Sequence, residues 1–299
     1  MNINKVVIMA GGILAILDDV AMLLDDTAVM SKVAAKKTAA LLGDDLAVNA
    51  EKATGFHASR ELPVIWAITK GALINKIIIL PVAFLLSAFL PWLIVPILLL
   101  GGAYLSYEGA EKVYEWLTGT HLNKPAASES SDKQEILNSE AVKIKSAIRT
   151  DFILSIEIIV ISLNTVIEQS ISIQIMVVSL IALLATAAVY GVVALLVRMD
   201  DVGLHLIERS VGMEGFSSTA SIFTGNLLIN SLPKVIHLLG IIGTIAMLLV
   251  GGGMFVHNIN ALHHLLDAIP TLAADLMVGL IVGMTLFALI SLGKLIRVR

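Results

Sequence analysis

Long runs of apolar residues, each close to the length of a helix that crosses a bilayer, dominate this chain. Three clear runs are Ile175–Val197, Val235–Val256 and Leu272–Leu292. A fourth, Ile148–Ile167, is equally long but contains Asp151, Glu157 and Asn164. Because a hydrocarbon core needs about 20 mostly apolar residues per helix, each run predicts one transmembrane span.

The stretch 62–107 is also largely apolar, but it is too long for a single span. Its core, Ile77–Leu90, is followed by Pro91 and then by Trp92–Tyr107. As one span it would also leave the eight basic residues of 1–76 on the outside, whereas a turn at residues 90–92 keeps them inside. The stretch therefore predicts two spans joined as a membrane hairpin. The hydrophobic pattern therefore predicts an all-α, polytopic membrane protein with about six transmembrane helices.

The distribution of charge orients these spans. The 20 lysine and arginine residues fall in blocks 1–76, 108–149, 198–234 and 294–299, which hold 8, 6, 3 and 3 of them. The connections near 90–92, 169–174 and 257–272 hold none. Basic residues concentrate on the cytoplasmic side of a membrane, so both termini are predicted to be cytoplasmic in a multi-pass protein.

This orientation divides the chain into four regions. Residues 1–61 show polar and apolar stripes of helical period, which predict amphipathic helices at the cytoplasmic face. Residues 62–107 form the hairpin, and 108–147 form a cytoplasmic segment with a flexible polar loop. Residues 148–299 form a four-helix membrane region with a cytoplasmic connection at 198–234.

Composition excludes several classes of function. With 57% hydrophobic and 15% charged residues, the chain has the lipid bilayer as its main partner, and its dispersed basic residues do not suit nucleic acid. The absence of cysteine excludes thiol catalysis and cysteine-ligated metals. The motifs of ATP hydrolysis, dinucleotide binding, zinc proteolysis and serine hydrolysis are also absent. We therefore predict no catalytic residues and no cofactor.

A weak internal repeat relates two parts of the chain. Asp44-Asp45, Leu62-Pro63, LLLGGAY (98–104) and Asp151 recur in order as Asp200-Asp201, Leu232-Pro233, LLVGGGM (248–254) and Asp275. The predicted topology gives the two glycine segments opposite orientations, which is typical of transporters built from inverted repeats. The alternative is that the matches reflect only the abundance of glycine and leucine in membrane helices.

Several segments resemble the YedI-like bacterial inner-membrane proteins. They are residues 14–51, which begin LAILDDVAMLLDD, then 60–81 (RELPVIWAITKGALINKIIILP), 150–166 (TDFILSIEIIVISLNTV) and 247–258 (MLLVGGGMFVHN). The resemblance implies a location in the bacterial inner, or plasma, membrane. Because that family is uncharacterised, it supplies no site residues.

The strongest candidate for a functional site is the polar stripe Glu157, Asn164 and Glu168. Steps of seven and four residues place the three on one helix face. A charged side chain inside a span costs at least about 2.5–3.5 kcal/mol unless it is paired or hydrated, so this face must point to water or into the bundle. The stripe predicts a cation or proton pathway; the alternative is a structural polar seam in which Glu157 pairs with Lys70 or Lys76.

Lys70, Asn75 and Lys76 interrupt the first span and complete the candidate transport pathway. Long lysine side chains can snorkel to the cytoplasmic interface. The other interpretation is that they supply counter-charge to Glu157 or to an anionic solute.

The remaining polar clusters carry weaker predictions. The aspartate pairs at Asp18, Asp19, Asp25, Asp26, Asp44, Asp45, Asp200 and Asp201 favour a solvated face, because pairs about 10 Å apart along one helix cannot share a Mg²⁺ ion. Asp151 and Asp275 are expected to lie in the first turns of their helices. His263 and Asp267 are weak candidates for a divalent metal site, against ordinary exposed loop residues.

These features favour a transporter or channel for a small ion or solute, with a polar pathway lined by Glu157. Two alternatives remain open: a non-catalytic membrane scaffold that binds a partner, and a Mg²⁺-dependent membrane enzyme acting on a phosphate-bearing lipid. Homo-oligomers are compatible with each of these interpretations.

Overall fold

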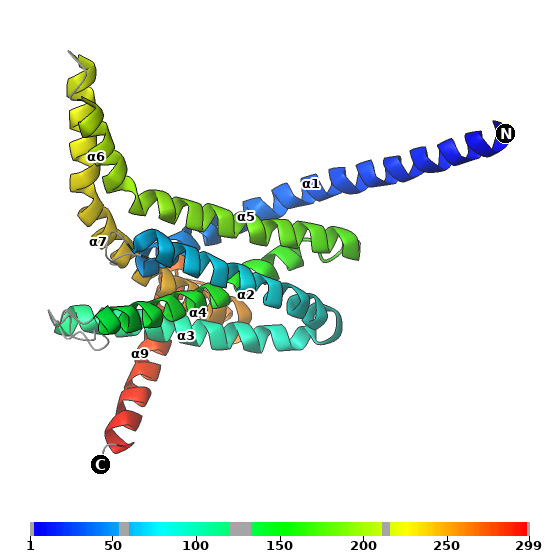
Figure 1. Ribbon diagram of the computed structural model, residues 1–299. Helices are drawn as coiled ribbons and strands as arrows, with labels where there is room; N and C mark the ends of the chain where they lie inside the picture. The colour runs from blue at the N-terminus through cyan, green and yellow to red at the C-terminus, as the bar shows by residue number, and fades with distance from the viewer. Residues whose placement is uncertain (1–2, 54–59, 120–132, 211–215, 298–299) are drawn as a thin grey trace.

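The computed structural model describes residues 3–53, 60–119, 133–210 and 216–297, without the side chains of 3–19, 40, 133–137 and 294–297. Within these ranges every element is helical (Figure 1). The elements are α1 (Ile3–Ala53), α2 (Glu61–Phe89), η1 (Pro91–Leu93), α3 (Ile94–Thr118), α4 (Lys133–Thr165), α5 (Ile171–Val197), α6 (Met199–Ser210), α7 (Phe216–Asn258), α8 (Asn260–Leu266) and α9 (Thr271–Arg297).

Five of the described helical segments are long and apolar enough to cross a membrane: α2, η1 with α3, α5, α7 and α9. The chain is thus a helical membrane protein, as its hydrophobic pattern predicts. The sixth predicted span, Ile148–Ile167, lies in α4, which is not among the five. Helix α4 begins upstream at Lys133 and is more polar than the other long helices, because charged residues continue along its first half.

The chain breaks between α2 and α3 at the predicted residues 90–92, where the short helix η1 begins at Pro91. The two helices then pack in different places. Helix α2 packs on α4 and α5, whereas α3 packs on α7 and α9. The predicted membrane hairpin therefore joins two parts of the bundle and is not itself a tightly packed pair.

Helix α1 differs most from the sequence-based expectation of several helices at the membrane face. It is one continuous helix, and its second half packs against α4, α5 and α7. Ala34, Val48 and Ala50 in that half have no exposed surface. Because alanine has a small side chain, other helices can approach α1 closely from several sides. The first half extends away from the bundle (Figure 1).

Contacts along α1 show that it runs parallel to α5. Ala34 lies in a hydrophobic cluster with Ile173 and Val177 near the start of α5. Farther along, Asn49 accepts a hydrogen bond from Tyr190, and Ala53 shares a cluster with Val197 at the end of α5. Residues 34–53 of α1 therefore traverse the same thickness as α5.

The predicted connection at 198–234 is helical where it is described. Helix α6 packs along the first part of α7, and this pair projects from the bundle (Figure 1). Gly203 and Gly225 lie at their crossing, where a methyl group on either glycine would approach the other's carbonyl oxygen. Of the segment 108–147, which was predicted to contain a flexible loop, residues 108–118 are helical in α3 and 133–147 are helical in α4, while 120–132 lie outside the described residues.

The two glycine segments of the weak repeat pack directly against each other. A methyl group on Gly102 would lie 2.8 Å from the Gly251 carbonyl oxygen, and one on Gly251 would lie 2.8 Å from that of Gly102. Gly109 instead meets Leu248 and Thr244, so α3 and α7 run antiparallel at this crossing. The segments thus have opposite orientations; a two-fold relation between whole halves stays a prediction.

Candidate functional site

A cavity of about 600 Å³ lies at one end of the bundle. Its lining includes Pro91, Ile167, Asn258 and Leu272, which belong to or adjoin the three connections predicted to be free of basic residues. Helices α1, α2, α3, α4, α7 and α9 contribute the walls. The cavity therefore penetrates between the membrane helices from the end predicted to face away from the cytoplasm.

Three carboxylates from three helices line this cavity. They are Asp44 of α1, Glu157 of α4 and Asp275 of α9. Glu157 lies about 12 Å along α4 from the helix end at Thr165, since eight positions separate the two at 1.5 Å each. The lining includes His257 but no lysine or arginine, so its charged groups favour a cation over an anion.

The carboxylate of Asp275 is buried, but one of its oxygens lacks the hydrogen bond that a buried charged group usually has. Its residue is 7% exposed, and its Oδ1 atom accepts no hydrogen bond from the described residues. The nearest cationic candidate is His257, whose Nδ1 atom lies 3.9 Å from Oδ1. That nitrogen also lies 2.8 Å from the Gly253 carbonyl oxygen. Asp275 thus has spare capacity to bind a cation or a proton.

A buried polar network lies deeper in the bundle, beyond the Glu157 end of the cavity. Lys76 of α2 pairs with Asp151 of α4, with 3.2 Å between Nζ and Oδ1, and donates to the Ser155 hydroxyl at 2.7 Å. Asn75 donates to the other Asp151 oxygen at 3.0 Å. Tyr190 of α5 donates toward Asp151 at 3.1 Å. Asp151 is therefore the common acceptor for α2 and α5.

Helix α1 joins the same network through Asn49 and Asp45. The Tyr190 hydroxyl also lies 3.0 Å from the Asn49 side-chain oxygen, so its single proton is shared between Asp151 and Asn49. The Asn49 amide donates to the Asp45 carboxylate. Asp45 adjoins Asp44 in sequence, so one turn of α1 contacts both the network and the cavity. Four helices thus meet in a single hydrogen-bonded unit.

The interior has more carboxyl groups than cations to balance them. The network and the adjacent cavity wall hold Asp44, Asp45, Asp151 and Glu157, and Lys76 is the cation that bonds to this set. Asp44 and Glu157 line the same cavity, and Asp45 follows Asp44 in α1. Since unbalanced buried charge is costly, the excess carboxylates must hold protons or a mobile cation.

A layer of ion pairs closes the opposite end of the bundle. Lys52 of α1 pairs with Glu108 of α3, which also accepts from Thr150 of α4 at 3.2 Å. Lys112 of α3 pairs with Glu51 of α1. The two lysines and two glutamates of these pairs balance each other. They therefore do not neutralise the carboxylates that line the cavity.

The structure separates the residues predicted to form one pathway. Glu157 and Asn164 line the cavity, whereas Glu168 is exposed and lies outside it. Lys70 is exposed, while Lys76 is buried and pairs with Asp151 instead of Glu157. Snorkelling therefore does not describe Lys76, because its ammonium group finds a buried carboxylate within reach.

The aspartate pairs occupy three different environments. Asp44 lines the cavity and Asp45 joins the network, whereas Asp25 and Asp26 are exposed on α1. Asp200 and Asp201 lie in the first turn of α6, where Asp201 pairs with Arg198 at 2.9 Å. The side chains of Asp18 and Asp19 are outside those described. Among the described residues these pairs do not converge into a shared metal centre.

The expectation that Asp151 and Asp275 lie in first turns was wrong. Helix α4 begins at Lys133, which places Asp151 well inside the helix. The first turn of α9 holds no acidic residue, because Asp275 is four positions beyond Thr271. No glycine or proline occurs between residues 133 and 165, and this absence was the available signal for a longer helix. Asn49 and Tyr190 were not predicted at all. Their roles arise from contacts between residues 141 positions apart, which no local pattern encodes.

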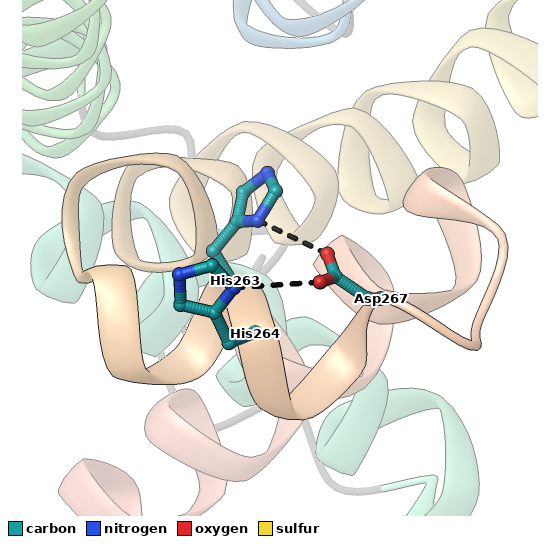
Figure 2. Close-up of side chains that lie close together, drawn as sticks. All are labelled: His263, His264 and Asp267. Atoms are coloured by element: carbon teal, nitrogen blue, oxygen red, sulfur yellow. Dashed lines mark ion pairs between the residues drawn. The ribbon is translucent and has the colours of Figure 1, made fainter.

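A separate polar cluster lies at the carboxyl end of α8 and includes both predicted metal ligands. Figure 2 shows the rings of His263 and His264 approaching the two oxygens of Asp267. The Nδ1–Oδ1 distance for His263 is 3.1 Å, and the Nδ1–Oδ2 distance for His264 is 3.5 Å. All three side chains are exposed.

Comparison with known proteins shows the family of this chain. A search of the curated proteins finds no match, and neither does a search of the solved structures. A family profile described as "Protein of unknown function (DUF808)" matches residues 11–293, which include the cavity and the buried network. This agrees with the resemblance to an uncharacterised family, but the match does not name the YedI-like proteins. The chain belongs to the DUF808 family.

Proposed function

We propose that this protein moves a small cation or a proton across the membrane, with Glu157 as the central group of the pathway. The observation that carries the proposal is the acidic cavity. Asp44, Glu157 and Asp275 reach it from three helices, and no lysine or arginine joins them. An intramembrane carboxylate beside a cavity is a common element of ion pathways.

The charge balance favours a cation over an anionic solute. Lys76 is the buried lysine of the first span, and its ammonium group already pairs with the Asp151 carboxylate and donates to the Ser155 hydroxyl. It is therefore not free to bind an anion. The uncompensated carboxyl groups near Glu157 instead provide oxygen ligands, which suit protons and hard cations.

The order of the cavity, the buried network and the ion pairs along the bundle supports a pathway that is closed at one end. The cavity reaches Glu157 from one side, while the Lys76–Asp151 network and the Lys52–Glu108 layer lie on the other. Passage requires these layers to separate, as in transporters that alternate access to a central site. We further propose a bacterial inner-membrane location with residues 120–132 and the carboxyl terminus in the cytoplasm, as the charge distribution favours.

Reconstituted protein tests the proposal. Proteoliposomes on a solid-supported membrane are exposed to concentration jumps of Na⁺, K⁺ and Mg²⁺ and to a pH jump, and the transient current is recorded. At least one jump should give a current that Glu157→Gln abolishes. Glu168→Gln is the matched control, because it changes an exposed carboxylate just beyond the end of α4, and it should keep the current.

Two results would contradict the proposal. One is the absence of current for all four jumps with protein that elutes as a folded species. The other is a current that survives Glu157→Gln unchanged. The first result favours the scaffold interpretation over transport, and the second removes Glu157 from the pathway.

A further inference from the structure

We propose that His263, His264 and Asp267 form a binding site for a divalent transition-metal ion of the Zn²⁺ type, separate from the acidic cavity. The three residues belong to one turn at the end of α8, which connects α7 to α9. The site stands on its own geometry and does not depend on the proposed transport function.

Helical geometry places Asp267 between the two histidines. At about 100° per residue, position 267 lies about 40° beyond position 263 and about 60° short of position 264 around the helix axis. Asp267 keeps helical dihedral angles, with φ −52° and ψ −28°, so the relation holds to the helix end. One carboxylate thus faces two imidazoles on one surface (Figure 2).

The distances match those that a small metal ion needs. Zinc bonds to histidine nitrogen and carboxylate oxygen are about 2.0–2.1 Å long, so two ligands at the tetrahedral angle lie about 3.3 Å apart. The two nitrogen–oxygen distances of 3.1 and 3.5 Å fall on either side of this value. Ligand atoms of all three residues lie within 4.8 Å of one another, and exposed side chains can rotate to close that gap.

The chemistry of the ligands selects the class of metal. Two imidazoles and one carboxylate suit zinc, cobalt, nickel or copper better than Mg²⁺ or Ca²⁺, which prefer oxygen ligands alone. The connection 259–270 contains no lysine or arginine, so no basic side chain of this segment competes for Asp267. Three protein ligands leave a fourth position for water or another group.

Metal binding to the full-length protein tests the inference. The protein is purified in detergent with a tag free of histidine and titrated with Co²⁺, whose visible absorption reports its coordination, and Zn²⁺ is then added to displace it. We expect one saturable site per chain. His263→Ala, His264→Ala and Asp267→Asn should each weaken Zn²⁺ binding by about tenfold or more.

His237→Ala is the matched control, because His237 is also exposed but lies on α7 away from this cluster, and it should bind Zn²⁺ as the parent does. The inference is overturned if no saturable site appears, or if His263→Ala and His237→Ala bind equally. Because binding is measured without flux, loss of the current in proteoliposomes leaves this result unaffected, and the two proposals fail separately.

Discussion

At the scale of single residues, the structure separates charges that hold the bundle together from charges that are available for function. Asp151 receives hydrogen bonds from Asn75, Lys76 and Tyr190, so its position is fixed by two neighbouring helices. Asp275 has a buried oxygen with no such partner. The two aspartates should therefore respond in opposite ways when their charge is removed.

Asp151→Asn should destabilise the protein strongly. It leaves Lys76, a residue that is 5% exposed, without its carboxylate partner, and loss of one partner of a buried pair costs about 3–5 kcal/mol. The free energy of unfolding in mixed detergent measures the effect. The double variant Lys76→Met with Asp151→Asn should recover much of the loss, because it buries no unpaired charge. Equal stability of Asp151→Asn and the parent would contradict the assignment of this ion pair.

Asp275→Asn should leave the protein equally stable or make it more stable, because no hydrogen bond to Oδ1 is lost and a buried charge is removed. The same change should reduce the cation current if Asp275 lines the pathway. Thermal unfolding of the purified variant and the current in proteoliposomes check the two parts. A large fall in the midpoint temperature would show that Asp275 has a structural partner after all.

At the scale of whole elements, glycine determines how closely the membrane helices can pack. Gly252 of α7 faces the backbone of α9, where an added methyl group would clash with the Asp275 carbonyl oxygen and the Gly279 nitrogen. Backbone atoms cannot rotate away as a flexible side chain can. The crossing of α7 and α9 therefore requires glycine at this position.

Gly252→Ala should destabilise the protein by at least about 1–3 kcal/mol, the cost typical of overpacking. Gly240→Ala is the matched control in the same helix, because nothing lies within 4 Å of the added methyl group. That control should be unchanged or up to about 1 kcal/mol more stable, since alanine favours helix more than glycine does. Unfolding of both variants in detergent makes the comparison. Equal stability of the two would mean that the α7–α9 crossing is looser than described.

Elements marked by local signals were predictable from the sequence. Pro91 marks the break between α2 and α3, and the apolar runs identify α5, α7 and α9. The central position of α1 was missed, because a helix rich in alanine and charge resembles one that lies on a surface. Its alanines instead provide close contact, and its buried polar groups find partners on other helices.

The candidate site was predictable only in part, for the same reason. Glu157 is identified by its position inside an apolar run. The partners of Lys76 are not, because Asp151 lies 75 residues away and only the packing of α2 on α4 brings the two together. The sequence shows which polar groups need a partner, whereas the choice of partner depends on the fold.

At the scale of the whole molecule, the path of α1 conflicts with the prediction, made from the basic residues, that both termini are cytoplasmic. Residues 34–53 run parallel to α5, so Lys32, Lys36 and Lys37 lie toward the end of the bundle where α5 begins. That end is also where the cavity meets the connections without basic residues. The packing therefore favours opposite sides for the first half of α1 and the carboxyl terminus, while 16 of the 20 basic residues stay on one side.

Cysteine labelling should decide both this question and whether α4 crosses the membrane. The chain has no native cysteine, so single cysteines can be placed at Met22 on α1, at Ser170 between α4 and α5, and at Ser130. An impermeant maleimide applied to intact cells should label the first two, and the third only after permeabilisation. If α4 does not cross the membrane, the cysteine at Ser170 will be labelled only after permeabilisation, like the cysteine at Ser130. If the first half of α1 lies in the cytoplasm, as its basic residues predict, the cysteine at Met22 will be labelled only after permeabilisation, while the cysteine at Ser170 is labelled in intact cells. The packing of α1 on α5 would then have to differ in the membrane.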